Sequence, residues 1–373
     1  MGDTAAIKRL DTIPADHPCL WGELAVRDGD GLQTWQDATL LPPRLRSIRT
    51  RRPGQKVWWR RHSYGVFDAS GQHVRTLSDM RGQRHICHPN TRLEDNRFKP
   101  ERLQEHELVL YGGTLYDAFG HLILDSGRTY QLMREYRDSD LPVWFHDAKP
   151  DCHPGSILKL GLVKAWLKQL GLSRRVRLIR RPLRARQLIS CSALYNDRDF
   201  ASTDLRPACL AALKPRLRKR LEAIRQPRRR LAYLSRHKLS FGSTSYPQEV
   251  ELVERLARLS HVDVICPEEL TFEEKLGLYH RYEVIAGFPQ ACMGLKLFVP
   301  GDQPAQQVMV IAGPRSLSTT WVNIDRAAGW GDFYVDCDLG IPQTGADDPS
   351  KPFQRTNSFD TETVLQAIQD LTR

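Results

Sequence analysis

The sequence predicts an α/β protein with two domains, each built on a parallel sheet. Short apolar segments alternate with helical segments, and polar loops follow the strands, which is typical of a doubly wound sheet. This order occurs twice, between Leu108 and Leu194 and between Arg230 and Phe298. At 373 residues, the chain is long enough for each domain to bury its own core. In such sheets, ligands bind beyond the carboxyl ends of the strands.

The second of these segments has the clearest pattern. We expect three strands and two helices, which in chain order are Leu231–Leu234, a helix from about Gln248 to Leu259, Val262–Ile265, a helix over Thr271–Tyr279, and Glu283–Ala286.

Composition indicates an ordinary globular protein, with 40% hydrophobic and 27% charged residues. No apolar run approaches the roughly 18 residues of a spanning helix, and the first twenty residues lack an apolar signal core. We therefore expect a cytoplasmic protein. Eight scattered cysteines without a CxxC pair predict reduced packing thiols and no structural zinc.

The positive charge is concentrated in residues 172–230. This segment has 18 Lys and Arg against 4 Asp and Glu, a local charge of +14 within a chain of net charge +11. Such a block can attract nucleic acid, anionic lipid head groups or an acidic polysaccharide. A solvated helix face with a basic linker explains it equally well.

The first domain contains a candidate general base. We expect a strand over Leu108–Tyr111, a turn at Gly112–Gly113, and a helix with Asp117 as N-cap that runs through Met133. On this helix His121, Asp125 and Arg128 share one face. A carboxylate four residues after a histidine can hold it in one tautomer as a base. A surface ion pair, a satisfied buried histidine and a two-ligand metal site are the alternatives.

The second domain contains a candidate anion site. Arg236 follows the strand Leu231–Leu234, where a guanidinium can bind a diphosphate in a bidentate manner. The loop up to Tyr246 is rich in Ser, Thr and Gly, and a helix starting at Gln290 offers backbone N–H groups. Neither GxGxxG nor a Walker A sequence is present. Ordinary turn and cap chemistry is the competing interpretation.

The ordered set of motifs resembles the family 61 glycosyltransferases, which include bacterial capsular-polysaccharide enzymes. The motifs are YLSR ending at Arg236, QEVELVERL from Gln248, the stretch from VICPEEL to VIAG ending at Gly287, and the earlier AFGHLILDSGR from Ala118 to Arg128. The resemblance implies a GT-B-like fold, with two Rossmann-like domains facing across a cleft. It also implies an inverting, metal-independent transfer from a nucleotide-sugar in surface polysaccharide synthesis.

The resemblance also implies domains and roles. We expect an acceptor-side domain over 1–196 with a strand-rich N-terminal portion, a basic linker over 197–230, a nucleotide-sugar domain over 231–357, and a helix over 358–373 that returns to the first domain. His121 and Asp125 are the expected catalytic residues, and Arg128 lies on the acceptor side. The expected sugar-donor site comprises Ser235, Arg236, Ser243, Glu249, Glu274, Gly287, Gln290 and Ala291. Glu249 and Glu274 are expected to contact the nucleotide's sugar or to orient Arg236.

The resemblance further implies the partners. They are a nucleotide-sugar and a glycan acceptor, with an anionic or lipid-linked acceptor and peripheral contact with the inner membrane left open. We expect no cofactor and no metal, so Asp336 and Asp338 are interpreted as parts of a strand-end loop.

Two alternative functions stay open. The family commonly has His-Gly where this chain has Pro289-Gln290, and Gln248 and Lys275 replace its usual Asn and Gln, so an inactive binding subunit is one alternative. The other is a nucleic-acid-binding protein that uses residues 172–230. It is disfavoured because only Tyr195 and Phe200 are available there for base stacking.

Overall fold

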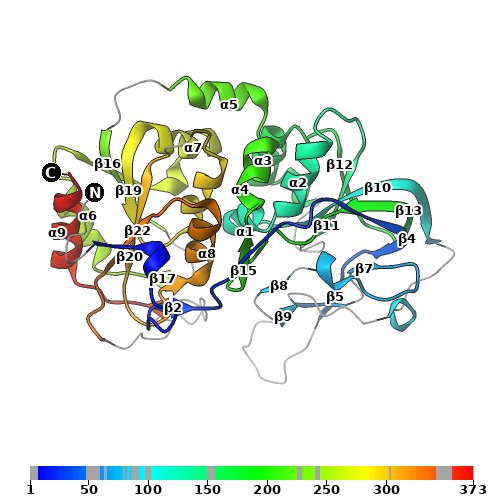
Figure 1. The fold of residues 1–373 in the computed structure, drawn as a ribbon, viewed down its shortest axis with the longest axis horizontal. Helices are drawn as coiled ribbons and strands as arrows, with labels where there is room; N and C mark the ends of the chain where they lie inside the picture. The colour runs from blue at the N-terminus through cyan, green and yellow to red at the C-terminus, as the bar shows by residue number, and fades with distance from the viewer. Residues whose placement is uncertain are drawn as a thin grey trace. The chain divides into compact units, whose positions relative to one another are not determined.

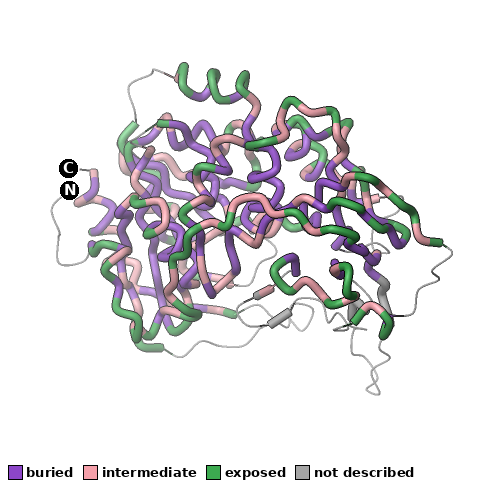
Figure 2. Tube along the Cα trace, turned by 45° about the vertical axis from the view of Figure 1, so that its right-hand side comes forward, coloured by how far each residue is buried: buried purple, intermediate pink, exposed green. Residues whose placement is uncertain are grey.

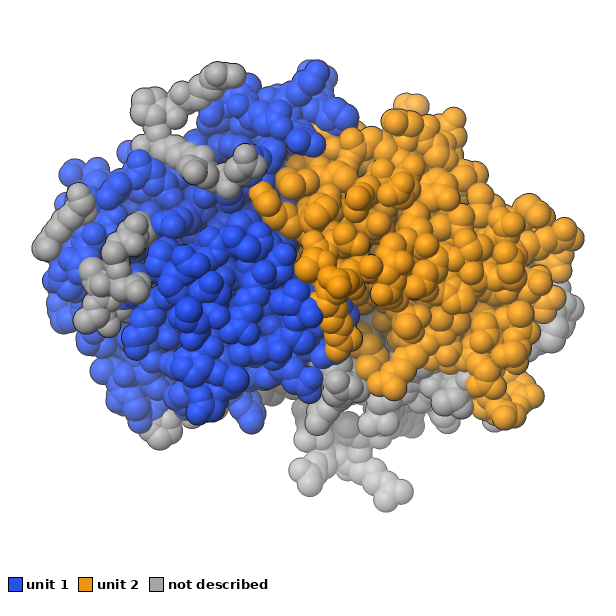
Figure 3. Space-filling view, in the orientation of Figure 1, with its two compact units in different colours: residues 1–26, 198–201, 215–373 blue, residues 27–197, 202–214 orange. Residues whose placement is uncertain are grey.

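The computed structural model describes residues 7–47, 59–62, 65–78, 80–81, 84–85, 92–96, 102–148, 156–224, 229–239, 244–301, 304–341 and 355–372. The chain divides into two compact units (Figure 3). Unit 1 contains residues 1–26, 198–201 and 215–373, and unit 2 contains residues 27–197 and 202–214. Each unit is built around a six-stranded sheet, so the predicted α/β class is confirmed.

The sheet of unit 1 has the order β1-β22-β20-β19-β16-β18 (Figure 1). Its strands are β1 (Ile7–Arg9), β16 (Arg229–Leu234), β18 (Val262–Ile265), β19 (Tyr282–Gly287), β20 (Gln306–Ile311) and β22 (Phe333–Asp336). All neighbouring strands are parallel except β1, which is antiparallel to β22. The five parallel strands, numbered along the chain, have the order 2-1-3-4-5, which is common in doubly wound sheets. The winding direction therefore reverses between β16 and β19.

In its described residues, unit 1 also contains five α-helices and three 3-10 helices. They are α5 (Pro215–Glu222), α6 (Glu249–Leu256), α7 (Phe272–Arg281), α8 (Thr319–Ala328) and α9 (Thr361–Thr372), with the 3-10 helices η1 (Leu10–Thr12), η6 (Pro267–Glu269) and η7 (Ala291–Phe298). Leu252 of α6 and Ile368 of α9 share one core cluster with Leu231 and Tyr233 of β16. Short strand pairs complete unit 1: β2 (Leu20–Trp21) with β21 (Leu317–Ser318), and β17 (Thr244–Ser245) with β23 (Arg355–Thr356).

The sheet of unit 2 has the order β12-β11-β10-β13-β4-β7. Its strands are β4 (Gln33–Leu41), β7 (Gly65–Phe67), β10 (Gln104–Leu115), β11 (Val143–Asp147), β12 (Val176–Leu178) and β13 (Leu183–Ser190). The first four strands in this order are parallel, and β4 and β7 are antiparallel to their neighbours. Along the chain the parallel strands have the order 3-2-1-4, so their winding reverses between β10 and β13.

The remaining elements are short. Unit 2 has α1 (Phe119–Leu124), α2 (Gly127–Glu135), α3 (Gly161–Leu170), α4 (Leu205–Ala212), η2 (Arg75–Leu77), η3 (Leu93–Asp95), η5 (Ile157–Lys159), and the hairpins β5 (Arg44–Ser47) with β6 (Trp59–His62) and β8 (Met80–Arg81) with β9 (Arg84–His85). The strands β3 (Val26–Arg27), β14 (Tyr195–Asn196) and β15 (Phe200–Ser202) lie near the points where the chain passes between the two units' residue ranges. Figure 2 shows buried sheet strands and an exposed outer face on α5.

Several local predictions are confirmed. The strands β16, β18 and β19 and the helices α6 and α7 lie where the alternation placed them, within a few residues. Among the described residues, no helix combines the length and hydrophobicity needed to cross a bilayer.

The helix predicted from Asp117 to Met133 is wrong in two respects. It is two helices, α1 and α2, and the N-cap of α1 is Ala118 rather than Asp117. The break lies at Ser126, whose hydroxyl donates to the Leu122 carbonyl at 2.7 Å. It also brings Gly127 against Leu194, where a Cβ would approach to 2.9 Å.

The predicted Gly112–Gly113 turn is instead part of β10. The strand continues to Leu115, and its pairing with β11 shifts register between Tyr111 and Thr114. Gly113 has φ 93°, and a Cβ on Gly112 would approach the Phe145 ring to 2.4 Å. The two glycines therefore form an irregularity in the strand rather than its end.

The observed units differ from the predicted domain boundaries. Residues 1–26 belong to unit 1 because β1 pairs with β22. The expected linker 197–230 contains β15, α4, α5 and the start of β16, with 225–228 outside the described residues. The C-terminal helix α9 packs against α6 and β16 of unit 1.

Candidate functional site

The carboxyl edge of unit 1 brings together the turns after β16 and β19. Gln290, after β19, donates its side-chain N–H to the carbonyl of Leu234 at the end of β16, at 2.8 Å. Arg236 donates in the other direction, to the carbonyls of Pro289 at 2.9 Å and Thr244 at 3.1 Å. The predicted residues Arg236 and Gln290 therefore lie together where the winding reverses, the usual ligand position of such sheets.

Gly287 makes this approach of two strand ends possible. Its φ is 151°, and a Cβ at this position would approach the Leu234 carbonyl oxygen to 2.6 Å. A side chain would therefore push the two turns apart. This predicted residue shapes the edge through its lack of a side chain.

Arg236 retains hydrogen-bonding capacity after its two carbonyl contacts. The residue is partly buried, and its Nε is buried without a hydrogen-bond partner among the described residues. Buried donors in native proteins are normally paired, so an unpaired one at a strand end favours a ligand or water there. The carbonyl contacts fix the guanidinium, which is also the structural role that ordinary turn chemistry predicts.

Glu249 holds the backbone of this turn. It is the first residue of α6 and is 1% exposed. Its Oε1 accepts from the backbone N–H of Arg236 at 3.0 Å and from the Tyr233 hydroxyl at 3.1 Å. Burial raises the pKa of Glu249, and the Arg236 N–H opposes that rise. Glu249 therefore contacts Arg236 through the backbone N–H of the arginine.

A small pocket adjoins Arg236. Its volume is about 110 Å³, and its lining includes Arg236, His237, Thr244, Tyr246 and Glu249. Whole-ligand pockets typically span about 300–1,000 Å³, so this one suits a single group such as a phosphate. Ser243, also predicted for this site, lies outside the described residues.

Sequence reasoning did not single out His237. The hydroxyl oxygen of the fully buried Ser235 lies 2.6 Å from its Nδ1 and accepts its backbone N–H at 3.2 Å. The Ser-x-His spacing after a strand was the available signal, because a serine hydroxyl commonly bonds the backbone two residues later.

Two other predicted donor-site residues have local roles. Glu274 forms a capping box with Thr271, accepting the Thr271 N–H at 2.8 Å. This bond lowers the pKa of Glu274. The T-x-x-E spacing at Thr271 was the sequence signal for this cap. Ala291 begins η7, which is a 3-10 helix with Gln290 as its N-cap.

In unit 2, the predicted pair of His121 and Asp125 is formed. The Nδ1 of His121 lies 2.9 Å from Oδ2 of Asp125, and their side chains are 33% and 17% exposed. A carboxylate only accepts, so Nδ1 carries the ring proton and Nε2 is the basic nitrogen. The Tyr116 ring lies beside the imidazole, with centroids 5.5 Å apart. The pair follows the carboxyl end of β10, next to the reversal at β13.

Arg128 is buried, and backbone carbonyls bind its guanidinium. It is 2% exposed and donates to the carbonyls of Thr76 at 2.9 Å, Ser78 at 3.0 Å and Cys191 at 3.2 Å. These contacts join three segments that are distant in sequence. Arg128 lies on α2, after the break that separates it from His121 and Asp125, and its expected acceptor-side role stays a prediction.

The basic segment 172–230 is divided between the two units, and part of its described charge is paired. The ion pairs are Arg218 with Glu222, Arg220 with Glu273, Arg229 with Asp263, and Arg230 with Glu283. Arg175 donates to the carbonyls of Leu141 and Arg137. These side chains have local partners, which accords with the interpretation as solvated faces.

No protein-family model matches the chain, and no curated protein matches it at a significant level.

Proposed function

We propose that this chain is an inverting glycosyltransferase that uses a nucleotide-sugar, with unit 1 binding the nucleotide diphosphate. One observation carries the proposal: Arg236 and Gln290 meet at the carboxyl edge of unit 1, where the winding of a 2-1-3-4-5 sheet reverses. The unpaired Nε of Arg236 and the phosphate-sized pocket beside it favour an anionic ligand.

Arg236 has the chemistry that the leaving group needs. When the bond between the anomeric carbon and the diphosphate oxygen breaks, the electron pair stays on the diphosphate. A guanidinium already oriented by two carbonyls stabilises that developing charge without reorganising.

The pair of His121 and Asp125 supplies the other half of the reaction. The hydroxyl oxygen of the acceptor forms the new bond to the anomeric carbon, and its proton passes to Nε2 of His121. Asp125 holds the Nδ1 proton and stabilises the imidazolium that results.

The test is nucleotide binding by matched variants. Thermal stability is measured at high salt with UDP, CMP and GDP beside a short oligonucleotide, since a nucleotide at about 100 times its Kd stabilises by about 2.7 kcal/mol. We expect one nucleotide to raise the Tm of the wild type and of Arg230→Ala, but not of Arg236→Ala. Arg230 is the control because it lies at the other end of β16 in an exposed pair with Glu283.

Binding alone does not establish transfer, so the second measurement is turnover. Sugars linked to the bound nucleotide are incubated with the protein, and release of free nucleotide diphosphate is followed. Unchanged affinity in Arg236→Ala, or oligonucleotide binding without any nucleotide effect, contradicts the proposal. Nucleotide binding without turnover of any donor favours the inactive binding subunit instead.

A further inference from the structure

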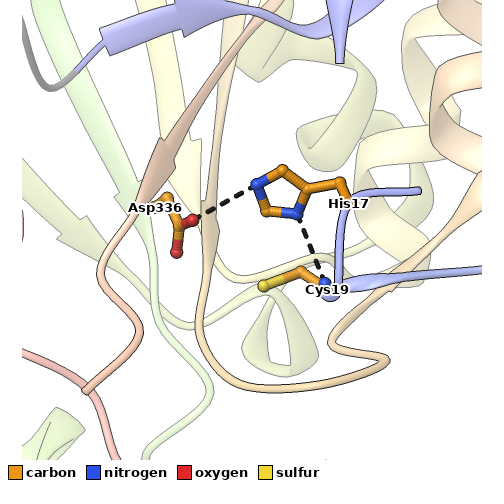
Figure 4. A group of neighbouring side chains, drawn as sticks. All are labelled: His17, Cys19 and Asp336. Atoms are coloured by element: carbon orange, nitrogen blue, oxygen red, sulfur yellow. Dashed lines mark hydrogen bonds and ion pairs between the residues drawn. The ribbon is translucent and has the colours of Figure 1, made fainter. Parts of the chain in front are cut away.

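Three side chains of different metal-binding types converge in unit 1, and none of them lines the pocket beside Arg236. They are His17 and Cys19, between η1 and β2, and Asp336, the last residue of β22. One ligand atom from each lies within 4.8 Å of the others. Figure 4 shows the imidazole, thiol and carboxylate turned toward one another. Asp336 is also at the carboxyl edge of the sheet, where ligands of parallel sheets bind.

We propose that His17, Cys19 and Asp336 bind one divalent transition-metal ion with the ligand preferences of zinc. Imidazole, thiolate and carboxylate are the ligand types of zinc sites in proteins. Three protein ligands leave one tetrahedral position for water or a substrate atom. The side chains of His17 and Asp336 are 13% and 31% exposed, so the cluster is reachable from solvent. From the sequence we expected no metal and interpreted Asp336 as part of a strand-end loop.

The separation of two ligand atoms supports this assignment. Nε2 of His17 lies 3.3 Å from Oδ2 of Asp336. Two atoms that are each about 2.05 Å from a tetrahedral ion are about 3.3 Å apart. The hydrogen-bonded pair of His121 and Asp125 in the same chain is closer, at 2.9 Å. The spacing at His17 therefore fits two ligands of one ion, and it is longer than a well-formed hydrogen bond.

The surrounding backbone fixes the ligands before any ion binds. Oδ1 of Asp336 accepts the backbone N–H of Asp338 at 3.1 Å, which leaves Oδ2 toward His17. The carbonyl of Cys19 accepts from Leu317 N–H at 2.9 Å, at the pairing of β2 with β21. Such outer contacts orient metal ligands. Of the Asp336–Cys337–Asp338 triplet, one residue is a ligand, whereas the thiol of Cys337 donates to the Ile311 carbonyl.

Two competing roles for the cluster are weaker. Cys19 is fully buried, which disfavours a thiol nucleophile for an external substrate. A hydrogen-bonded network without metal uses Nδ1 of His17 as acceptor for the Cys19 backbone N–H at 3.3 Å. Coordination through Nε2 places the ring proton on Nδ1 and costs this long, weak bond. Binding also requires loss of the thiol proton, so metal uptake releases protons.

The test titrates zinc into the full chain against a chromophoric chelator. We expect one ion per chain, and at least about tenfold weaker binding in His17→Ala, Cys19→Ser and Asp336→Asn. Asp338→Asn is the matched control, because it changes a neighbouring carboxylate and keeps the backbone N–H that orients Asp336. Cobalt binding should give a thiolate charge-transfer band in the wild type that Cys19→Ser lacks.

The outcomes separate clearly. The proposal is overturned if Cys19→Ser and Asp336→Asn bind zinc with wild-type affinity. It is also overturned if the wild type does not compete with the chelator for zinc. Circular dichroism of each metal-free variant checks folding; if His17→Ala does not fold, the other two variants decide. The metal proposal does not depend on the proposed function, and nucleotide binding measured on the same variants distinguishes failure of one from failure of the other.

Discussion

Replacing Lys296 by methionine should destabilise unit 1 strongly and in a pH-dependent way. Lys296 and Asp332 are both 2% exposed at the side chain, and Nζ lies 2.5 Å from Oδ1. That Oδ1 also accepts the backbone N–H of Gln307 at 2.9 Å, and Nζ lies 4.5 Å from the Trp330 ring centroid. Removing the ammonium leaves a buried carboxylate without its counter-ion. Breaking such a pair costs about 3–5 kcal/mol, a large part of the usual stability of a domain.

The pH dependence has a definite sign. Burial raises the pKa of Asp332, and Lys296 opposes this rise, so the variant's pKa is higher still. A carboxyl group with a folded-state pKa above its unfolded value loses stability as pH rises between the two values. The nearby Asp325, with its pKa raised to about 7 mainly by burial, contributes the same trend between about pH 4 and 7. The free energy lost in Lys296→Met should therefore be larger at pH 8 than at pH 5.

The assay is urea unfolding followed by circular dichroism at both pH values. Arg230→Ala is the control, because the exposed Arg230–Glu283 pair should contribute only about 0–1 kcal/mol. The double variant Lys296→Met with Asp332→Asn should recover much of the pH-dependent loss. Equal losses at pH 5 and pH 8, or a loss no greater than that of the control, would refute the reasoning.

Three further predictions concern the candidate sites. Gly287→Ala should lower the free energy of unfolding by more than Gly301→Ala, because both have positive φ but only Gly287 faces a carbonyl; about 1–3 kcal/mol is expected from strain alone, measured by urea unfolding. Glu274→Ala should lower the free energy of unfolding slightly by loss of its capping box, while nucleotide affinity stays unchanged; weakened nucleotide binding would instead support a role of Glu274 in the sugar-donor site. Asp125→Asn should lower turnover more than acceptor or nucleotide binding, because the amide replaces the carboxylate that accepts the Nδ1 proton of His121; unchanged turnover would remove the pair from catalysis.

Local patterns predicted the elements, whereas contacts between distant residues decided their details. The alternation around β16, β18 and β19 was readable because apolar periodicity and strand length are local properties. The hydrogen bond between His121 and Asp125 followed from their spacing of four residues. The burial of Arg128 could not be read in this way, because the carbonyls of Thr76, Ser78 and Cys191 that hold it are remote in sequence.

The site residues also differ in how far apart in sequence their partners lie. The cap at Glu274 was readable from Thr271 three residues earlier, so that role was available to sequence analysis. The cluster of His17, Cys19 and Asp336 was not, since it joins residues more than 300 positions apart through the assembly of unit 1. The site at Arg236 was predictable in part. The sequence indicated where β16 and β19 end, but it did not show that these two strands are neighbours in the sheet.

The pairing of β1 with β22 has a consequence for the order in which the protein is made. The ribosome completes residues 7–9 long before it reaches residues 333–336, and unit 2 is encoded between them. Domains generally fold as units during synthesis, N-terminal first. Here, however, unit 2 can fold before β22 has been synthesised, so that β1 of unit 1 is still unpaired at that stage. During that interval β1 has no strand to pair with. Chaperone binding and translation pauses should therefore affect the folding of unit 1 more than the folding of unit 2.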